Sequence, residues 1–284
     1  MRKWYKYFLV FGAKEHTNIK KHQKFDEFEK AMGGYESNEF YQDRDKFFSK
    51  YLRGRFVNYK NYLENNLVGD EKIFSIASGR CINELLLIEK DFNVTCSDLD
   101  IPKSYYSAKK IFGDFNYKTL DILNSFTQER YSCILSLGIV YAFSKNELEK
   151  FFTNINKSLE IDGILILDSS SSANNFLTFL FDRIYLKLEN FLISLILNIL
   201  GKKNSTGIRH HGYKFTNSEI IELAKKKGFE IVHKNSQDYL TEISRSKIVN
   251  KLIKYIPISK YFFLLIGRFM PYLRFFKFKK IKDI

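Results

Sequence analysis

Between residues 71 and 168 the chain alternates short buried strands with helices, and this alternation constrains the fold more than any other feature. We expect strands at 72–77, 93–98, 116–121, 132–137 and 163–168, with helices at 82–90, 102–112 and 146–160. Strand and helix units of this length form a parallel sheet with right-handed crossovers. The predicted fold class is therefore α/β, with a doubly wound and mostly parallel sheet.

The second predicted strand ends in an acidic residue that should lie beside the turn after the first strand. Residues 72–81 begin as an apolar strand and end in small residues around Gly79, whereas the second strand ends at Asp98. Ligands of doubly wound sheets bind outside the carboxyl ends of the strands, where an acid typically holds ribose hydroxyls. The pattern predicts a nucleoside-cofactor site, with Gly79 at the closest approach and Asp98 preferred over its neighbour Asp100.

The remaining residues flank this strand and helix series. We expect an N-terminal helical extension at 1–70 and a main domain at 71–284, with a helical insert at 174–212 and a basic, apolar tail at 245–284. Thr216 and Glu219 form a capping box that predicts a helix over 216–227, followed by a strand at 229–233. The alternating residues 275–281 predict a last, antiparallel strand.

Composition limits the classes of partner. The formal charge of +14 would suit nucleic acid or an anionic membrane, but Lys, Asn, Ile, Phe and Tyr are abundant together, as in AT-rich coding sequences. Cys81, Cys96 and Cys133 lack metal-ligand spacing, so we expect no metal site and three small buried side chains in a reducing compartment. No secretory signal is recognisable, and the longest apolar run, 191–200, is shorter than the roughly 20 residues of a membrane span. We expect a cytoplasmic protein.

Five segments in order carry a resemblance to a known family. The first is the strand and turn at 74–81, and the second and third are the acids Asp98 and Asp121. The fourth is the strand and loop at 131–144, together with the helix and strand that follow, and the fifth is the helix and strand at 216–232. In this order and spacing, residues 71–234 resemble the class I S-adenosylmethionine-dependent methyltransferases. The first turn of that family reads hydrophobic-Asp-hydrophobic-Gly-x-Gly-x-Gly. Here Gly79 alone remains of the three glycines, and Ser75 stands at the acidic position.

The resemblance implies a Rossmann-like fold, with N-terminal helices and a helical insert after the fifth strand, and S-adenosylmethionine as the cofactor. It assigns cofactor contacts to Ser75, Ala77 and Gly79 in the turn, Asp98 and Leu99 at the ribose, Asp121 and Ile122 at the adenine, Ser136 and Leu137 at the methionine part, and Arg55 at the cofactor carboxylate. Several of these have a plainer alternative: a tight turn at Gly79, a solvated turn carboxylate at Asp98, a capping aspartate at Asp121, core packing at Ser136 and Leu137, and a solvated face at Arg55.

The acceptor side is expected in the insert, where Arg209, His210, His211 and Tyr213 follow one another closely. An oxygen nucleophile gains from a base whose pKa is close to neutral, so His210 or His211 is the candidate general base. We expect Arg209, Tyr213 and Tyr141 to contact the acceptor. Adjacent loop histidines are as often surface or structural residues.

Three functions are compatible with these patterns. The preferred one is an enzyme that O-methylates a small molecule, a sugar or a lipid-linked glycan, with peripheral contact to the inner membrane face through the apolar insert and basic tail. Covering a core is the simpler role for these helices. An RNA or other nucleic-acid methyltransferase is suggested by charge alone, and the fourth strand lacks the Asp/Asn-Pro-Pro-Tyr/Phe pattern of base amino-group methylation. The missing glycines favour the third, a non-catalytic relative that binds a partner.

Overall fold

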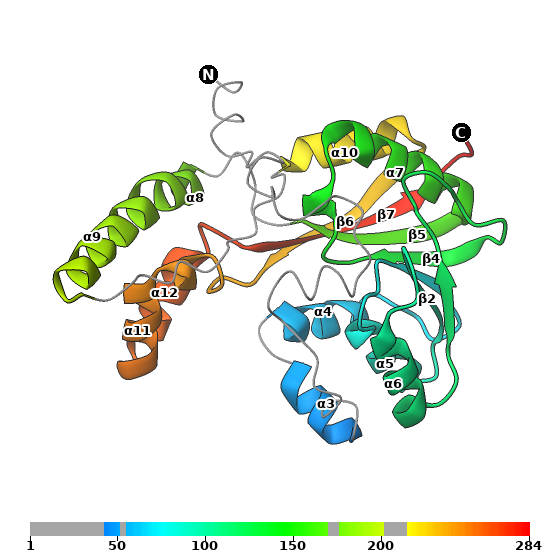
Figure 1. Cartoon of the computed structure of the whole chain (residues 1–284). Helices are drawn as coiled ribbons and strands as arrows, with labels where there is room; N and C mark the ends of the chain where they lie inside the picture. Colours follow the sequence, from blue (N-terminus) through cyan, green and yellow to red (C-terminus); the bar gives the residue numbers. More distant parts are fainter. Residues whose placement is uncertain (1–42, 52–54, 170–175, 202–214) are drawn as a thin grey trace.

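A seven-stranded sheet with the order β3-β2-β1-β4-β5-β7-β6 organises the chain. The computed structural model describes residues 43–51, 55–169, 176–201 and 215–284. The strands are β1 (Lys72–Ile76), β2 (Asn93–Asp98), β3 (Asn116–Thr119), β4 (Tyr131–Ser136), β5 (Leu159–Ser169), β6 (Phe229–Gln237) and β7 (Leu273–Lys280). Strands β1 to β5 pair in parallel, and β7 lies antiparallel between β5 and β6. The predicted doubly wound, mostly parallel sheet is confirmed (Figure 1).

The central strands form because their side chains are apolar on both faces. Ile73, Phe74, Ile134 and Leu135 are fully buried, as expected for strands covered by helices on each side. The predicted antiparallel strand at the end of the chain is confirmed as β7, whose Phe275, Phe276 and Phe278 are also fully buried.

Helices cover the sheet on both faces (Figure 1). On one face lie α3 (Arg44–Tyr51), α4 (Arg55–Glu64), α5 (Ile82–Ile88) and α6 (Lys103–Phe112), which share a core cluster with Ile73, Cys96 and Cys133. On the other face lie α7 (Lys145–Ser158) and α10 (Asn217–Lys226), which pack on Phe74 and Ile134. Capping boxes from Ser144 and Thr216 begin α7 and α10, and the one at Thr216 is the capping box that the sequence predicts. The three cysteines are free and buried, as predicted.

Several element boundaries differ from the predicted ones. Strand β3 ends at Thr119 rather than residue 121, because the Asp121 carboxylate accepts from the Leu123 amide at 3.0 Å and turns the chain. Strand β5 begins at Leu159, where α7 was expected to continue, because Leu159 already pairs with Tyr131 ahead of an irregularity in the ladder. Strand β6 runs on to Gln237 because β7 pairs with it along that length.

The predicted insert after the fifth strand is helical in its described part and meets the tail. It comprises α8 (Phe176–Leu180), a π-helical turn η4 (Phe181–Tyr185) and α9 (Leu186–Ile199); the tail adds η5 (Ile243–Arg245), α11 (Lys247–Tyr255) and α12 (Ser259–Gly267). The Glu189 carboxylate of α9 accepts from the Ser246 hydroxyl at 3.1 Å and the Ile248 amide at 2.7 Å, at the start of α11. We call residues 176–200 and 240–270 the arm, since they project together from the sheet (Figure 1). No helix among the described residues is long and apolar enough to cross a membrane.

Candidate functional site

The sheet reverses its strand order between β1 and β4, and this point locates the candidate site. Ile76 at the end of β1 is in register with Ser136 at the end of β4. In open α/β sheets ligands bind in the crevice at such a reversal, outside the carboxyl ends of the strands. The turn over residues 77–81 and the end of β2 border the same edge.

The turn after β1 has left-handed backbone at three alternate residues. The φ angles are 56° at Ala77, 50° at Gly79 and 58° at Cys81. These positions are those at which the family pattern has its glycines. A left-handed conformation costs a residue with a Cβ roughly 1–2 kcal/mol, so Ala77 and Cys81 hold a strained backbone that glycine would adopt freely. The three positions that are glycine in the family pattern thus have a left-handed backbone, which glycine favours, although two of them are Ala77 and Cys81 here.

Serine side chains tie this turn to β2. The Ser78 amide donates to the Ser97 carbonyl at 2.9 Å, and the Ser78 hydroxyl donates to the Ser75 carbonyl at 3.1 Å. The Ser97 hydroxyl reaches the same carbonyl at 2.8 Å. These bonds fix the turn against the end of β2, which brings Asp98 next to Gly79.

Asp98 faces the turn as predicted. Its Oδ2 accepts from the Gly79 amide at 3.1 Å and its Oδ1 from the Leu99 amide at 2.7 Å. Burial raises the pKa of Asp98 to about 6, with a further increase from Asp100, while the two amide bonds oppose the increase. Each carboxylate oxygen still has a second acceptor direction, and the side chain is only partly buried. The group is therefore placed to accept two neighbouring hydroxyls in its ionised form.

A second carboxyl group, which sequence reasoning missed, lies next to the strand that precedes the turn. Glu84 lies in the first turn of α5, is 3% exposed and accepts from the Ser75 hydroxyl at 2.5 Å. Burial raises its pKa, the Ser75 hydrogen bond opposes this, and the charge of Asp98 adds to the increase. The available signal was one acidic residue within the apolar run 82–88. A carboxyl group thus adjoins position 75, although that position is a serine.

Two buried polar atoms near the turn have no hydrogen-bond partner among the described residues. They are the Ser136 hydroxyl, at the end of β4, and the Asn83 Oδ1, in the first turn of α5. Buried polar atoms without a partner are rare and cost about 1–3 kcal/mol each. Together with Asp98 and the turn, these two atoms fit a polar nucleoside cofactor. S-adenosylmethionine carries hydroxyl, amine and carboxylate groups that could form hydrogen bonds with them.

A further polar cluster lies at the carboxyl end of β5. The Asp168 carboxylate accepts from the Tyr59 hydroxyl at 2.9 Å and the Gly138 amide at 2.5 Å. Arg274 of β7 is fully buried nearby and donates to the Ser169 hydroxyl at 3.0 Å. Burial lowers the pKa of Arg274 to about 9, against the opposing effect of Asp168. The cluster joins α4, the loop after β4 and two strands, and no local pattern in the sequence indicated it.

Several solved structures have the same fold as this chain. A S-adenosylmethionine-dependent methyltransferase from Methanosarcina mazei is 15% identical, with a TM-score of 0.52 over 78% of this chain and 98% of its own. Magnesium protoporphyrin IX methyltransferase from Synechocystis PCC 6803, with bound S-adenosylhomocysteine, is 13% identical, with a TM-score of 0.52 over 90% of this chain and 94% of its own.

A third structure is the 1,6-didemethyltoxoflavin-N1-methyltransferase from Burkholderia thailandensis, with bound 1,6-didemethyltoxoflavin and S-adenosylhomocysteine. It is 13% identical, with a TM-score of 0.51 over 84% of this chain and 87% of its own. This chain has the class I methyltransferase fold. The resemblance seen in the sequence is thus confirmed at the level of the fold. No protein-family model and no curated protein matches the sequence.

Within this methyltransferase fold, the other predicted site residues lie in several environments. Asp121 caps the turn after β3, because its Oδ2 also accepts from the Asn124 side chain at 2.7 Å, and Ile122 is buried in the core. Leu137 packs on a core cluster, and Tyr141 lies in the 3-10 turn η3 (Val140–Ala142). Arg55 is the first residue of α4, and its side chain lies outside the described set. Arg209, His210, His211 and Tyr213 also lie outside the described residues.

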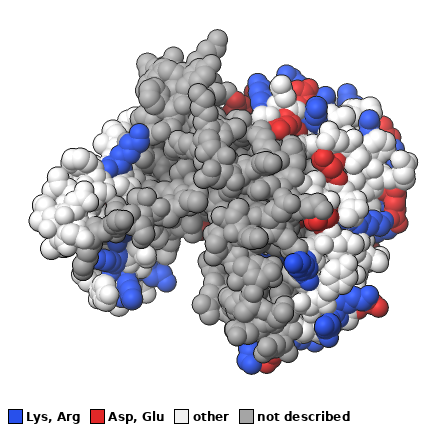
Figure 2. Space-filling model, viewed as in Figure 1, with Lys and Arg blue, Asp and Glu red and all other residues white. Residues whose placement is uncertain are grey.

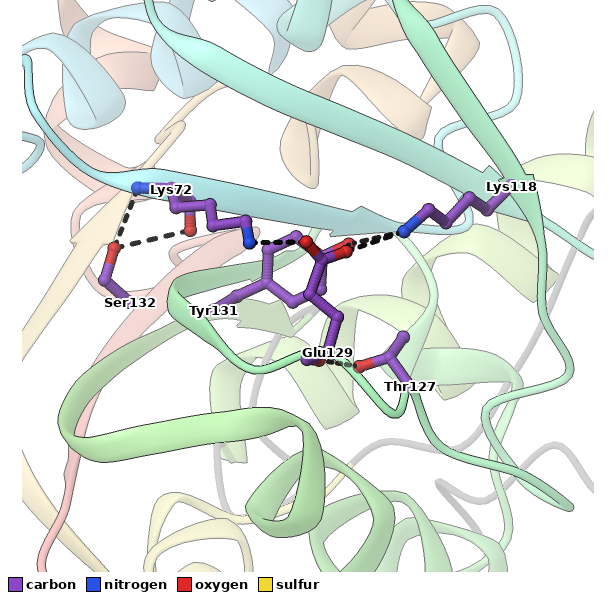
Figure 3. A network of polar contacts seen from close by, with 6 residues as sticks. All are labelled: Lys72, Lys118, Thr127, Glu129, Tyr131 and Ser132. Carbon is purple, nitrogen blue, oxygen red and sulfur yellow. Dashed lines mark hydrogen bonds and ion pairs between the residues drawn. The ribbon is translucent and has the colours of Figure 1, made fainter.

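A separate ionic network is centred on Glu129, just before β4 (Figure 3). The Glu129 carboxylate accepts from Lys72 Nζ at 2.5 Å, Lys118 Nζ at 2.8 Å and the Tyr131 hydroxyl at 2.9 Å. Hydrogen bonds from Lys118, Lys72 and Tyr131 lower the pKa of Glu129 to about 2. Lys72 begins β1 and Tyr131 begins β4, whereas Lys118 belongs to β3, so the network joins the amino ends of β1 and β4 to β3.

Proposed function

We propose that this chain is an S-adenosylmethionine-dependent methyltransferase. The observation that carries the proposal is the strained turn, in which Ala77 and Cys81 remain left-handed at the two replaced glycine positions. Strain of this kind gathers at ligand sites, where the surrounding structure holds it. A turn that merely connected a strand to a helix could relax around alanine and cysteine. The ribose acid Asp98 and the buried Ser136 hydroxyl add independent support.

In this proposal the residues of the crevice mainly bind and orient. When bound, S-adenosylmethionine supplies an electrophilic methyl group on a sulfonium. Ionised Asp98 accepts the ribose hydroxyls as charge-assisted hydrogen bonds, and the left-handed turn lets the cofactor approach the backbone. Asp121, Ile122, Leu137 and Arg55 are the remaining proposed cofactor contacts. Positioning supplies most of the rate in such a displacement.

The acceptor is proposed to be a hydroxyl of a small molecule, a sugar or a lipid-linked glycan. His210 or His211 would take the proton of that hydroxyl as the methyl carbon–oxygen bond forms and the methyl carbon–sulfur bond breaks, with S-adenosylhomocysteine as the leaving group. Arg209, Tyr213 and Tyr141 would contact the acceptor. A small-molecule acceptor is supported by the similar Burkholderia structure, which contains 1,6-didemethyltoxoflavin. We further propose that the protein is cytoplasmic and works at the inner membrane face, since its arm is apolar and basic.

Calorimetric titration of the full chain with S-adenosylmethionine and S-adenosylhomocysteine tests the cofactor. We expect a micromolar Kd, about −8 kcal/mol, and a loss of roughly 100-fold in Asp98→Ala, because two charge-assisted hydrogen bonds disappear. Asp114→Ala, at an 81% exposed side chain before β3, is the matched control and should bind normally. If neither ligand binds, the chain is a non-catalytic relative. Tight, salt-dependent RNA binding would instead favour the nucleic-acid alternative.

A further inference from the structure

The arm carries most of the large apolar side chains that are exposed in the described part of the chain. On α9 these include Leu188, Phe191 and Ile199, and on α11 and α12 they include Tyr255, Tyr261 and Phe262. Ile199 is 76% exposed and Phe191 is 63% exposed. Soluble monomers rarely expose large contiguous apolar surfaces, and such surfaces usually mark a binding site for a protein or a membrane. The arm is therefore a candidate interaction surface.

The exposed charges of the arm, among the side chains that the structure describes, are all positive. Its exposed charged side chains, among those described, are Lys187, Lys247, Lys251, Lys254, Lys260 and Arg268. Its described acids, Glu189 and Glu242, are buried at 4% and 1% exposure. On the face that Figure 2 presents, the arm at the left is white and blue, whereas the sheet domain mixes blue with red. A partner that complements the arm must be both apolar and anionic.

Helix α11 shows how the two kinds of side chain are arranged. Ile248, Leu252 and Tyr255 form one exposed stripe at helical spacing, and Lys247, Lys251 and Lys254 form the stripe beside it. The helix is held to the rest of the arm by Val249, which is buried. Helices with a basic stripe and an apolar stripe of this kind lie in the interface of anionic membranes.

The arm also carries a shallow apolar pocket of about 380 Å³, wide open to solvent, between the insert and α12. Leu180 and Ile184 line it on one side and Ile266 and Met270 on the other, and the stacked rings of Phe181 and Tyr185 complete the wall. Its described lining residues are all uncharged. Its size falls within the range of small-ligand sites, and its lining suits a hydrocarbon chain rather than a head group. The π-helical turn η4 supplies several of these residues, and π turns often occur at functional sites.

The arm leaves the sheet at the edge that carries the crevice. Ser169, the last residue of β5, pairs with Arg274, which pairs with Ser236 near the end of β6. The insert therefore follows the carboxyl end of β5, while α11 and α12 join the end of β6 to the start of β7. A surface that the arm contacts would lie next to the carboxyl edge of the sheet.

We propose that the arm docks the protein onto an anionic lipid bilayer. The apolar side chains of α9, α11 and α12 enter the acyl region, the lysines contact the head groups, and the arm pocket takes one acyl chain. The docking itself does not depend on methyl transfer. Its consequence, that an amphiphilic acceptor reaches the crevice from the bilayer, rests on the proposed function.

Vesicle flotation of the full chain tests the docking. We expect binding to phosphatidylcholine vesicles that contain phosphatidylglycerol, weaker binding to pure phosphatidylcholine, and release by salt. The triple change of Lys247, Lys251 and Lys254 to Gln should lower the partition coefficient roughly 100-fold. The same number of changes at exposed lysines of α7 and α10, namely Lys145, Lys150 and Lys225, is the control and should have little effect.

A second variant tests the apolar contribution. Phe191→Ser with Ile199→Ser removes two exposed side chains and should reduce vesicle binding, whereas Val68→Ser, at a 66% exposed residue outside the arm, should not. Because the altered positions are exposed, far-ultraviolet circular dichroism should stay unchanged. The proposal is overturned if the changes at Lys145, Lys150 and Lys225 lower vesicle binding as much as the changes at the three arm lysines. It is also overturned if the protein forms a dimer that the Phe191 and Ile199 changes dissolve and does not bind vesicles. Cofactor titration without lipid reports separately on the proposed activity.

Discussion

Replacing Ala77 with glycine should stabilise the protein, although an alanine-to-glycine change usually does the reverse. Alanine at a φ of 56° costs roughly 1–2 kcal/mol, which glycine would recover. Glycine in turn loses about 0.5–1 kcal/mol through the greater freedom of the unfolded chain. The partly buried methyl group contributes a few tenths more to that loss, on the scale of about 0.8 kcal/mol for a fully buried methylene. The net expectation is a gain of about 0.5 kcal/mol.

Urea denaturation of the full chain, followed by fluorescence or circular dichroism, measures this difference. Ala108→Gly is the matched control, because Ala108 is 1% exposed within α6, where glycine should cost about 1 kcal/mol or more. The two variants should therefore move the urea midpoint in opposite directions. A midpoint in Ala77→Gly that falls as far as in Ala108→Gly would refute the strain argument. The affinity for S-adenosylhomocysteine should be at least as high in Ala77→Gly as in the parent chain.

Four other outcomes follow from the contacts. The affinity for S-adenosylhomocysteine should rise about tenfold from pH 5 to pH 7.5, because Asp98, with a pKa of about 6, accepts hydroxyls when ionised; a calorimetric pH series on Asp98→Asn should be flat. The same raised pKa means that the ligand-free protein gains stability from Asp98 as the pH falls through 6 towards the unfolded value near ~4. Tyr59→Phe leaves the Asp168 carboxylate short of one donor and should lower the free energy of unfolding by about 1–3 kcal/mol; an unchanged urea midpoint would contradict the bond. Glu129→Gln should lower the thermal midpoint at pH 7 and not at pH 2, because the ionised Glu129 carboxylate, whose pKa is lowered to about 2, stabilises the folded state only when the pH is above 2. Cofactor affinity should stay the same in this variant. A change in that affinity would place the network in the site.

Some of this protein can be read from neighbouring residues alone. The central strands were predictable because burial on both faces requires unbroken apolar runs. The capping box of Thr216 and Glu219 was predictable because a cap and its partner are three residues apart. The alternation of aromatic and basic residues in 275–281 predicted β7, since one strand presents successive side chains to opposite faces. Boundaries were wrong at β3 and β5, where a side-chain cap and a cross-strand pair decide the ends.

The candidate site divides in the same way. Gly79 and Asp98 were indicated by their places at strand ends, and the structure brings them to 3.1 Å. Left-handed backbone at Ala77 and Cys81 was not predictable, because neither residue type favours it, and only the surrounding bonds impose it.

The Asp168 cluster depends wholly on tertiary structure, because Tyr59 is 109 residues from Asp168 along the chain and no periodic pattern connects them. The same holds for the arm: the sequence marks its helices as apolar and basic, but which stripes stay exposed is settled only when the insert and the tail pack together. Local pattern determines which elements form and which face is apolar. Contacts between distant segments decide which polar groups meet and which apolar faces remain uncovered.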